Sequence, residues 1–244
     1  MVLNFDYIKG FITNDGEIPV PFRWSHGATE LDMGDGLLIY TLIQFTRSKN
    51  CVCIGSGGGY VPRIMTQARI DLHRSGIFEG NPDYNWGDIG ATYVVDPCNG
   101  IGGQSNMEDE AGFYRSNFYP RFIKETSEKA YYNFFVMQDI KIDFLFIDGD
   151  HSYEGVSLDF DLYKNIMNDD GIIAIHDTDR DFSKNYIVTE DQKKDFHEFN
   201  GPSQFVSDFV NDGNWEIFNL FNYGRLKDKP ASSGITLFKK KKND

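Results

Sequence analysis

The stretch KIDFLFIDGD, Lys141–Asp150, restricts the fold more than any other part of the sequence. Its middle is almost entirely apolar, as expected of a central parallel strand that is buried on both faces. Shorter apolar runs occur in Asn50–Ile54, Ala91–Val95 and Gly171–His176, and stretches with a helical pattern lie between them. This alternation predicts a doubly wound α/β sheet in which these strands run parallel.

The C-terminal third predicts a reversed strand in the same sheet. We expect a helix over Gly201–Gly213, followed by strands over Asn214–Phe221 and Ser233–Lys240. The link between these strands is too short for a crossover helix, so they should be antiparallel neighbours. With a further strand expected over Asn133–Asp139, the predicted fold is a doubly wound, mostly parallel seven-stranded sheet with a C-terminal antiparallel strand.

Further helices are expected between the strands. In the last of them Val156, Phe160, Tyr163 and Met167 recur at the spacing of one helical stripe, and Gly171 is expected to end it. The expected helices are Gly34–Ser48, Val61–Gly76, Arg121–Tyr132 and Tyr153–Gly171.

Composition excludes several classes of function. The net charge of −13 argues against a protein that tracks the nucleic-acid backbone, because that task needs a basic face. The sequence has no apolar run long enough to span a membrane, and its start lacks the features of a signal peptide. We therefore expect a cytoplasmic protein with neither nucleic acid nor membrane as a partner.

The chain reads as one domain with two additions. Residues 1–30 look like an N-terminal extension or lid, and residues 31–244 form a single domain with a loop insertion near 77–90. The cysteines lack further Cys or His at the spacing of a zinc site, so we expect packed, reduced thiols. These cysteines are Cys51, Cys53 and Cys98.

Three of the predicted strands end in acidic residues: Asp96, Asp148 and Asp177. The carboxyl ends of parallel strands meet at one edge of the sheet, where ligands of such folds bind. The three carboxylates should therefore lie on one rim.

A glycine cluster follows the first strand. Gly55, Gly57 and Gly59 form a G-x-G-x-G pattern before a helix, which suits either close approach of a ligand to the backbone or a plain tight turn. Tyr60 stands where a dinucleotide fingerprint needs a small residue, which argues against an NAD-dependent dehydrogenase. Asp96 at the next strand end could bind both hydroxyls of a ribose, or cap the turn before Pro97.

The two later strand ends carry a cluster of carboxylates and imidazoles. Asp148 and Asp177 on neighbouring strands suit a hard divalent cation, and without one their like charges would repel. His151 lies close enough to act as a general base near neutral pH, although Asp150 and His151 could instead cap the following helix. His176 is equally compatible with a metal ligand and with a hydrogen-bonded structural histidine.

Four segments together resemble a known group of enzymes. CIGSGGGY, VVDP, FLFIDGDHSYEGVSLDFDLY and DDGIIAIHDT are similar to class I S-adenosylmethionine-dependent methyltransferases, which have a Rossmann-like fold. The likeness is greatest to the metal-dependent O-methyltransferases that include macrolide-sugar methyltransferases and cephalosporin-hydroxylase-like proteins. It spans roughly residues 30–180.

The resemblance implies methyl transfer from S-adenosylmethionine to a hydroxyl of a small molecule, such as a sugar or natural product. It implies Asp148 and Asp177 as ligands of a divalent cation, with magnesium as the expected ion, and His151 as the general base. One position departs from the pattern: Cys53 stands where the family usually has an acidic residue that helps to hold the amino group of the cofactor.

The resemblance also implies a cofactor site. Asp96 would bind the ribose, and Asp139 would lie near the adenine. The loop beneath the methionine part comprises Gly55, Ser56, Gly57 and Gly59.

Two alternatives stay open. A cofactor-binding protein of the same fold without methyl transfer would account for Cys53. A metal-dependent oxygenase could use His151, His176 and Asp177, since such sites combine two histidines with a carboxylate. The oxygenase would leave the glycine cluster and Asp96 unexplained, and neither the acceptor nor the oligomeric state follows from the sequence.

Overall fold

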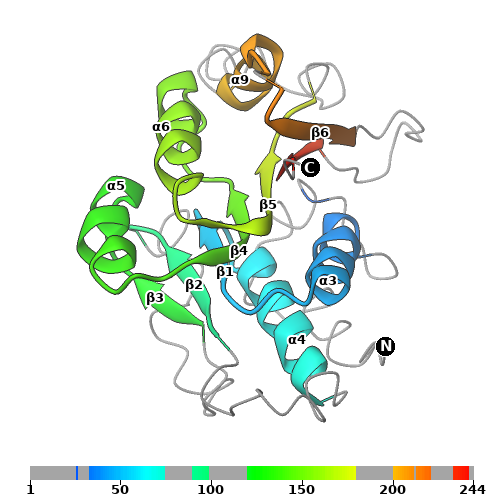
Figure 1. The fold of residues 1–244 in the computed structure, drawn as a ribbon, viewed down its shortest axis with the longest axis vertical. Coiled ribbons are helices and arrows are strands. Elements are labelled where there is room, and N and C mark those ends of the chain that lie inside the picture. Colours follow the sequence, from blue (N-terminus) through cyan, green and yellow to red (C-terminus); the bar gives the residue numbers. More distant parts are fainter. Residues whose placement is uncertain are drawn as a thin grey trace.

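The computed structural model describes residues 26, 33–74, 90–98, 120–179, 200–211, 213–220 and 233–241. These residues contain a seven-stranded sheet in the order β3-β2-β1-β4-β5-β7-β6 (Figure 1). Strands β1 to β5 run parallel, and β7 is antiparallel to both of its neighbours, which confirms the predicted fold class. The strands are β1 (Cys51–Ile54), β2 (Thr92–Val95), β3 (Arg121–Ile123), β4 (Ile142–Ile147), β5 (Met167–His176), β6 (Trp215–Leu220) and β7 (Ile235–Lys240).

Helices cover both faces of the sheet, which gives three layers (Figure 1). Helices α3 and α4 pack on one face, and α5, the π-helix η3, α6 and α9 pack on the other. Alternate residues of each strand therefore face different cores: Cys51 and Cys53 of β1 face α3 and α4, and Val52 and Ile54 face the opposite layer. The helices are α3 (Asp35–Thr46), α4 (Tyr60–Arg74), α5 (Ser127–Ala130), η3 (Tyr131–Val136), α6 (Tyr153–Tyr163) and α9 (Gly201–Asp208).

Strand β4 is the buried central strand that its composition predicts. Phe144 and Phe146 pack in one core, and Leu145 and Ile147 pack in the other. Full burial of each such side chain contributes about 1.5–3 kcal/mol relative to exposure. The strand is therefore fixed on both faces up to the residue that precedes Asp148.

The order of elements predicted over residues 121–139 is wrong. Arg121–Ile123 form a strand that pairs with β2, and the following residues are helical, whereas we expected a helix first and a strand second. The Oγ1 atom of Thr126 accepts a hydrogen bond from the Lys129 N–H and caps the helix at its start. Tyr131 and Phe135, four residues apart, then bury one helical face against the sheet.

The predicted helix over Tyr153–Gly171 is too long. Helix α6 ends at Tyr163, and Met167 begins β5, where it pairs with Ile142. Val156, Phe160 and Tyr163 form the buried stripe as predicted. Met167 has the sequence spacing of this stripe, but it belongs to β5 and not to the helix.

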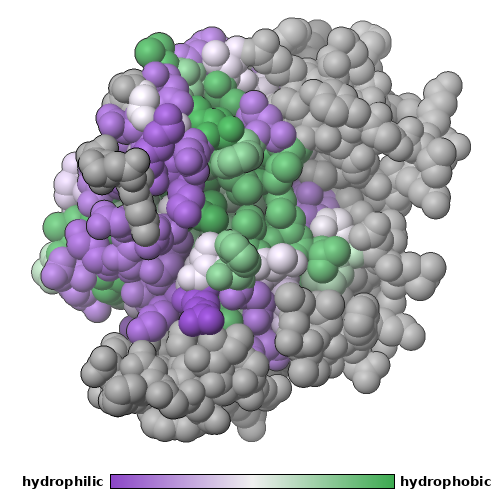
Figure 2. Space-filling view, turned by 45° about the vertical axis from the view of Figure 1, so that its right-hand side comes forward, coloured by the Kyte–Doolittle hydropathy of each residue, from purple (hydrophilic) through white to green (hydrophobic). Residues whose placement is uncertain are grey.

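The remaining expectations concern cysteines, surface and membrane. Cys51 and Cys53 are buried, reduced thiols as predicted. Cys98 is also a free thiol, but it is exposed, so the prediction that it is packed is wrong. Figure 2 shows apolar side chains gathered in a continuous area on one face, bordered by hydrophilic residues.

No helix within the described residues is long and apolar enough to cross a membrane. The predicted lid, apart from His26, and the predicted insertion, apart from Gly90, lie outside the described residues.

Candidate active site

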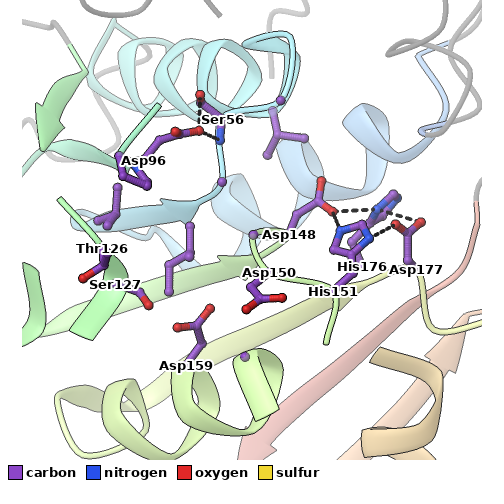
Figure 3. A pocket seen from close by; sticks show the side chains of 18 of the residues that line it. Ser56, Asp96, Thr126, Ser127, Asp148, Asp150, His151, Asp159, His176 and Asp177 are labelled. Carbon is purple, nitrogen blue, oxygen red and sulfur yellow. Dashed lines mark hydrogen bonds and ion pairs between the residues drawn. The ribbon is translucent and has the colours of Figure 1, made fainter. Parts of the chain in front are cut away.

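A pocket of about 830 Å³ opens at the carboxyl ends of the parallel strands. The segments that follow β1 to β5 line it (Figure 3). His26 lines it too. This is the edge at which open α/β sheets bind ligands. The three strand-end carboxylates Asp96, Asp148 and Asp177 all lie on its wall, as the sequence predicts.

The glycine loop approaches the end of β4 closely. Gly55 has φ 81°, and a Cβ atom at this position would overlap with the carbonyl oxygen of Asp148. Gly57 also has a positive φ of 49°, but a Cβ atom there would meet nothing within 4 Å. Gly55 is therefore required by packing against the β4 segment, whereas Gly57 borders open space.

Asp96 closes the glycine loop through hydrogen bonds. Its Oδ2 atom accepts from the N–H of Ser56 at 2.8 Å and from the Ser56 hydroxyl at 2.7 Å. Its Oδ1 atom accepts from the N–H of Cys98 at 2.7 Å, which is the turn-capping role weighed from the sequence. Each carboxylate oxygen has further lone-pair capacity, so ribose binding by Asp96 stays a prediction.

Asp139 does not lie near the other predicted cofactor residues. It precedes β4, so the length of that strand separates it from Asp148 and from the pocket. The resemblance implied this role for Asp139 after an expected strand, whereas the preceding residues Tyr131–Val136 are helical. Thr126 and Ser127, just after β3, line this part of the pocket instead.

Asp159 on α6 is a pocket residue that the sequence did not single out (Figure 3). Only 2% of its surface is exposed. Burial raises the pKa of this carboxyl to about 7, a hydrogen bond with Ser127 lowers it, and the charge of Asp150 adds to the increase. Nothing in the sequence marked Asp159 as a pocket residue, because it lies within a predicted helix and no residue of opposite charge is paired with it in the sequence pattern.

Cys53 occupies the position where the resemblance predicts an acidic residue. Its side chain packs in the core on the α3 and α4 side, and its thiol donates to the carbonyl of Gly55 at 3.1 Å. Burial raises the pKa of this thiol well above its usual value. Cys53 therefore supports the loop from within the core as a neutral group.

The predicted residues Asp148, His151 and Asp177 lie together. The His151 Nε2 atom is 3.1 Å from Asp148 Oδ1, and its Nδ1 atom is 3.4 Å from Asp177 Oδ2. Burial would lower the pKa of His151, but the two carboxylates raise it overall. The imidazole thus lies between the two carboxylates and neutralises part of their charge.

His176 lies at the centre of the same cluster and is 1% exposed. Its Nε2 atom is 3.1 Å from Asp35 Oδ2, and its Nδ1 atom is 3.1 Å from Asp177 Oδ1 and 3.3 Å from Asp148 Oδ1. Burial would lower the pKa of His176, yet Asp177 and Asp148 raise it well above its usual value. Because His176 compensates their charge, the pKa values of Asp148 and Asp177 are lowered despite burial.

Sequence reasoning missed two members of this cluster, His26 and Asp35. The His26 ring stacks 4.5 Å from the His176 ring, and its Nε2 atom is 3.9 Å from Asp148 Oδ2. Asp35, at the first turn of α3, lies 3.7 Å from His26 Nδ1. Both precede the first strand, and no spacing in the sequence links them to the strand ends.

The cluster suits a divalent cation by the chemistry of its donors. In the described residues, two groups have ligand atoms within 4.8 Å of one another: Asp148 with His151 and Asp177, and Asp148 with His26 and His176. Carboxylates this close need positive charge between them, which a cation or protonated imidazoles can supply. The set His151, His176 and Asp177, considered for an oxygenase, is not one of these groups.

The main chain at Asp177 is held in an unusual conformation. Its φ of 57° lies in the left-handed region, which Asp adopts more readily than most residues. The Ser233 hydroxyl donates to Asp177 Oδ1, and the Asp179 N–H donates to the Ser233 carbonyl at 2.9 Å. The segment before β7 therefore fixes Asp177 at the rim.

A family model described as a methyltransferase domain matches residues 52–178, more than half of the 244-residue chain. The chain belongs to this methyltransferase family. The matched part of the methyltransferase begins in β1 and ends just beyond Asp177, so it contains the ends of all five parallel strands, which line the pocket. The predicted methyltransferase class is thus confirmed.

Solved structures agree with the methyltransferase fold. A candidate caffeoyl-CoA O-methyltransferase from Staphylococcus aureus superposes with a TM-score of 0.61 at 13% identity, covering 98% of this chain and 93% of the other. The O-methyltransferase from Bacillus cereus in complex with SAH gives 0.59 at 14% identity, covering 85% and 80%. The O-methyltransferase TomG from Streptomyces achromogenes in complex with SAM gives 0.58 at 12% identity, covering 98% and 99%. No curated protein sequence gives a significant match.

Proposed function

We propose that this methyltransferase transfers a methyl group from S-adenosylmethionine to a hydroxyl of a small molecule, such as a sugar or natural product, with the help of a divalent cation. The observation that carries the proposal is the composition of one pocket. It combines a glycine loop closed by Asp96 with an Asp and His cluster at the ends of β4 and β5. Two O-methyltransferases of the same fold contain SAH or SAM, which supports this choice of cofactor.

The cofactor would lie across the carboxyl ends of β1 and β2. Gly55, Ser56, Gly57 and Gly59 would support its methionine part, since the open space beside Gly57 lets a ligand lie against the backbone. Asp96 would accept hydrogen bonds from the ribose. The adenine would then reach the wall formed by Thr126, Ser127 and Asp159, which replaces the site predicted around Asp139.

The acceptor hydroxyl would lie beside the Asp and His cluster. Asp148 and Asp177 would hold the cation, whose chemistry here is to lower the pKa of a bound hydroxyl. His151 would receive the proton. Only the neutral imidazole can accept a proton, and Asp148 and Asp177 raise the pKa of His151, which favours its charged form. The oxygen would then attack the sulfonium methyl in line, so that the new C–O bond forms as the S–C bond breaks and S-adenosylhomocysteine leaves, with most of the rate arising from positioning.

Calorimetric titration with S-adenosylmethionine tests the cofactor site. We expect the wild type to bind and Asp96→Asn to bind at least about tenfold more weakly, which corresponds to a loss of about 1.4 kcal/mol. Asn keeps the size of the side chain but loses the charge that attracts two hydroxyl donors. Asp161→Asn, an exposed position on α6, is the matched control.

The proposal fails if folded wild type binds no S-adenosylmethionine. Methyl transfer is tested separately, by mass spectrometry of sugar and polyphenol acceptors incubated with S-adenosylmethionine and the protein. Cofactor binding without transfer to any hydroxyl acceptor would favour the alternative of a cofactor-binding protein.

A further inference from the structure

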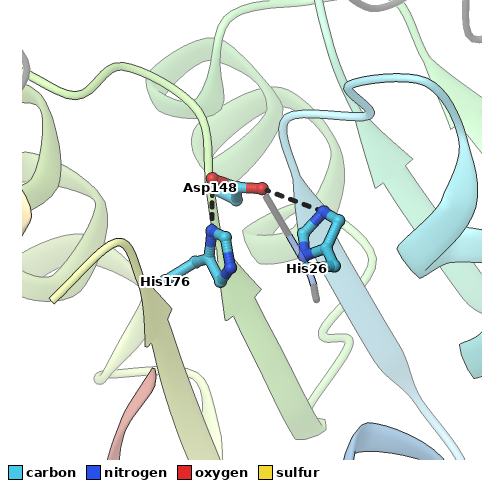
Figure 4. A group of neighbouring side chains, drawn as sticks. All are labelled: His26, Asp148 and His176. Atoms are coloured by element: carbon cyan, nitrogen blue, oxygen red, sulfur yellow. Dashed lines mark ion pairs between the residues drawn. The ribbon is translucent and has the colours of Figure 1, made fainter. Parts of the chain in front are cut away.

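We propose that His26, Asp148 and His176 form a binding site for a divalent transition-metal ion such as Zn²⁺ (Figure 4). This site differs from the Asp148 and Asp177 pair expected from the sequence, because two of its three ligands are imidazoles. It also includes a residue from the N-terminal segment, which lies outside the family match. The inference does not depend on methyl transfer.

His176 presents a nitrogen that has no hydrogen-bond partner. Its Nδ1 atom is completely buried and makes no hydrogen bond within the described part of the chain, although Asp148 and Asp177 lie 3.3 and 3.1 Å away. Its Nε2 atom faces Asp35 Oδ2 at 3.1 Å and can donate its proton there. A carboxylate behind one ring nitrogen fixes the tautomer and leaves the lone pair of the other nitrogen for a metal.

His26 completes the arrangement from the other side of Asp148 (Figure 4). Its Nε2 atom is 3.9 Å from Asp148 Oδ2, and its buried Nδ1 atom, also without a hydrogen bond, is 3.7 Å from Asp35 Oδ2. Asp35 therefore lies behind both histidines, while Asp148 lies in front of them. Leaving the buried Nδ1 atom of His176 without a hydrogen bond costs about 1–3 kcal/mol, which a bound cation would remove.

The spacing of the donor atoms suits a small ion. Ligand atoms at about 2.0–2.2 Å from a tetrahedral ion lie about 3.3–3.6 Å from one another. His176 Nδ1 lies 3.3 Å from Asp148 Oδ1, at the lower limit of this range, and His26 Nε2 lies 3.9 Å from Asp148 Oδ2, slightly above it. Small adjustments of side-chain torsions would therefore close the site.

The donor types select among metals. Magnesium prefers oxygen ligands and keeps several waters, whereas imidazole nitrogen suits Zn²⁺, Co²⁺ and related ions. The rings of Tyr60 and Phe146, centred 5.6 and 6.3 Å from the His26 ring, shield this side from water. The same three ligands also line the pocket, so a further coordination position would face it, as in catalytic metal sites with three protein ligands.

Metal titration of the chelator-treated full-length protein tests the site. We expect one Zn²⁺ per chain by calorimetry in the presence of excess Mg²⁺, and a visible absorption spectrum on addition of Co²⁺. His26→Gln should weaken Zn²⁺ binding by at least about 100-fold, the upper range seen when even an indirect supporting group is lost. His26 is the residue to change, because replacing the fully buried His176 in β5 would also disturb the core.

Two matched histidine variants make the result specific. His73→Gln, on α4, should bind Zn²⁺ as the wild type does, and His151→Gln should keep at least a tenth of the wild-type affinity. Circular dichroism confirms that each variant is folded. Binding lost in His151→Gln but kept in His26→Gln would assign the ion to the Asp148, His151 and Asp177 group and overturn the proposal. Failure of folded wild type to bind Zn²⁺ or Co²⁺ would overturn it too, irrespective of whether S-adenosylmethionine binds.

Discussion

Single residues decide the shape of the pocket, and Gly55 is the clearest case. Replacing it by Ala should destabilise the fold by more than the same change at Gly57, where only the positive φ opposes a side chain, at about 1–2 kcal/mol. The extra cost at Gly55 arises because the Cβ atom would push against the carbonyl of Asp148. Urea unfolding of both variants measures the difference, and equal losses of stability would contradict it.

A second residue-scale prediction concerns Asp159. The folded protein keeps the proton of this carboxyl up to about pH 7, whereas the unfolded chain loses it near 3.8. Between these values the folded state binds more protons, so the free energy of unfolding falls as the pH rises, by about 1 kcal/mol per pH unit for this group. This contribution is complete below pH 4 and is lost above pH 7.

Asp159→Asn should remove that dependence. Relative to the wild type, the variant should become more stable between pH 5 and pH 8, by about 2–3 kcal/mol over this interval. Unfolding by urea at several pH values gives the comparison, with the exposed Asp161→Asn as control on the same helix. Parallel stability curves for wild type and Asp159→Asn would show that the carboxyl is already ionised in the folded state.

Among the elements, helix α6 connects the candidate site to the sheet. Ser152 caps its start by accepting a hydrogen bond from the Gly155 N–H at 3.0 Å, directly after His151. Ser152→Ala should therefore cost about 1 kcal/mol of stability. Ser157→Ala, at a half-buried position of the same helix, should be neutral or slightly stabilising, because Ala is the best helix former. Thermal unfolding distinguishes the two, and an equal effect would argue against the capping role.

The elements also show where sequence patterns were sufficient. Strand β4 was predictable because burial on both faces leaves a continuous apolar run, Phe144–Ile147, at the end of the strand. The elements within residues 121–139 were not predictable from the sequence, because β3 is an edge strand of only three residues with mixed burial. The aromatic run Tyr131–Val136 fits a strand by propensity, and only packing of Tyr131 and Phe135 against the sheet makes it helical.

At the scale of the molecule, topology explains which site residues the sequence could place. Asp96, Asp148 and Asp177 follow parallel strands, so knowing the fold puts them on one rim. Asp35 reaches the same cluster through the packing of α3 on the sheet, and His26 lies against Asp35 and His176. No periodicity encodes that contact, which adds a third imidazole and a third carboxylate to the cluster.

The last third of the chain is built into this rim as well. The Gly201 N–H, at the start of α9, donates to the His151 carbonyl at 3.1 Å, and a Cβ atom at Gly201 would collide with that carbonyl. Ser233, just before β7, holds Asp177. Transfer of only the family-matched segment, residues 52–178, into another scaffold would include the ends of all the parallel strands. It would omit Gly201 and Ser233, which support His151 and Asp177. The smallest portable catalytic unit of this protein is therefore nearly the whole chain.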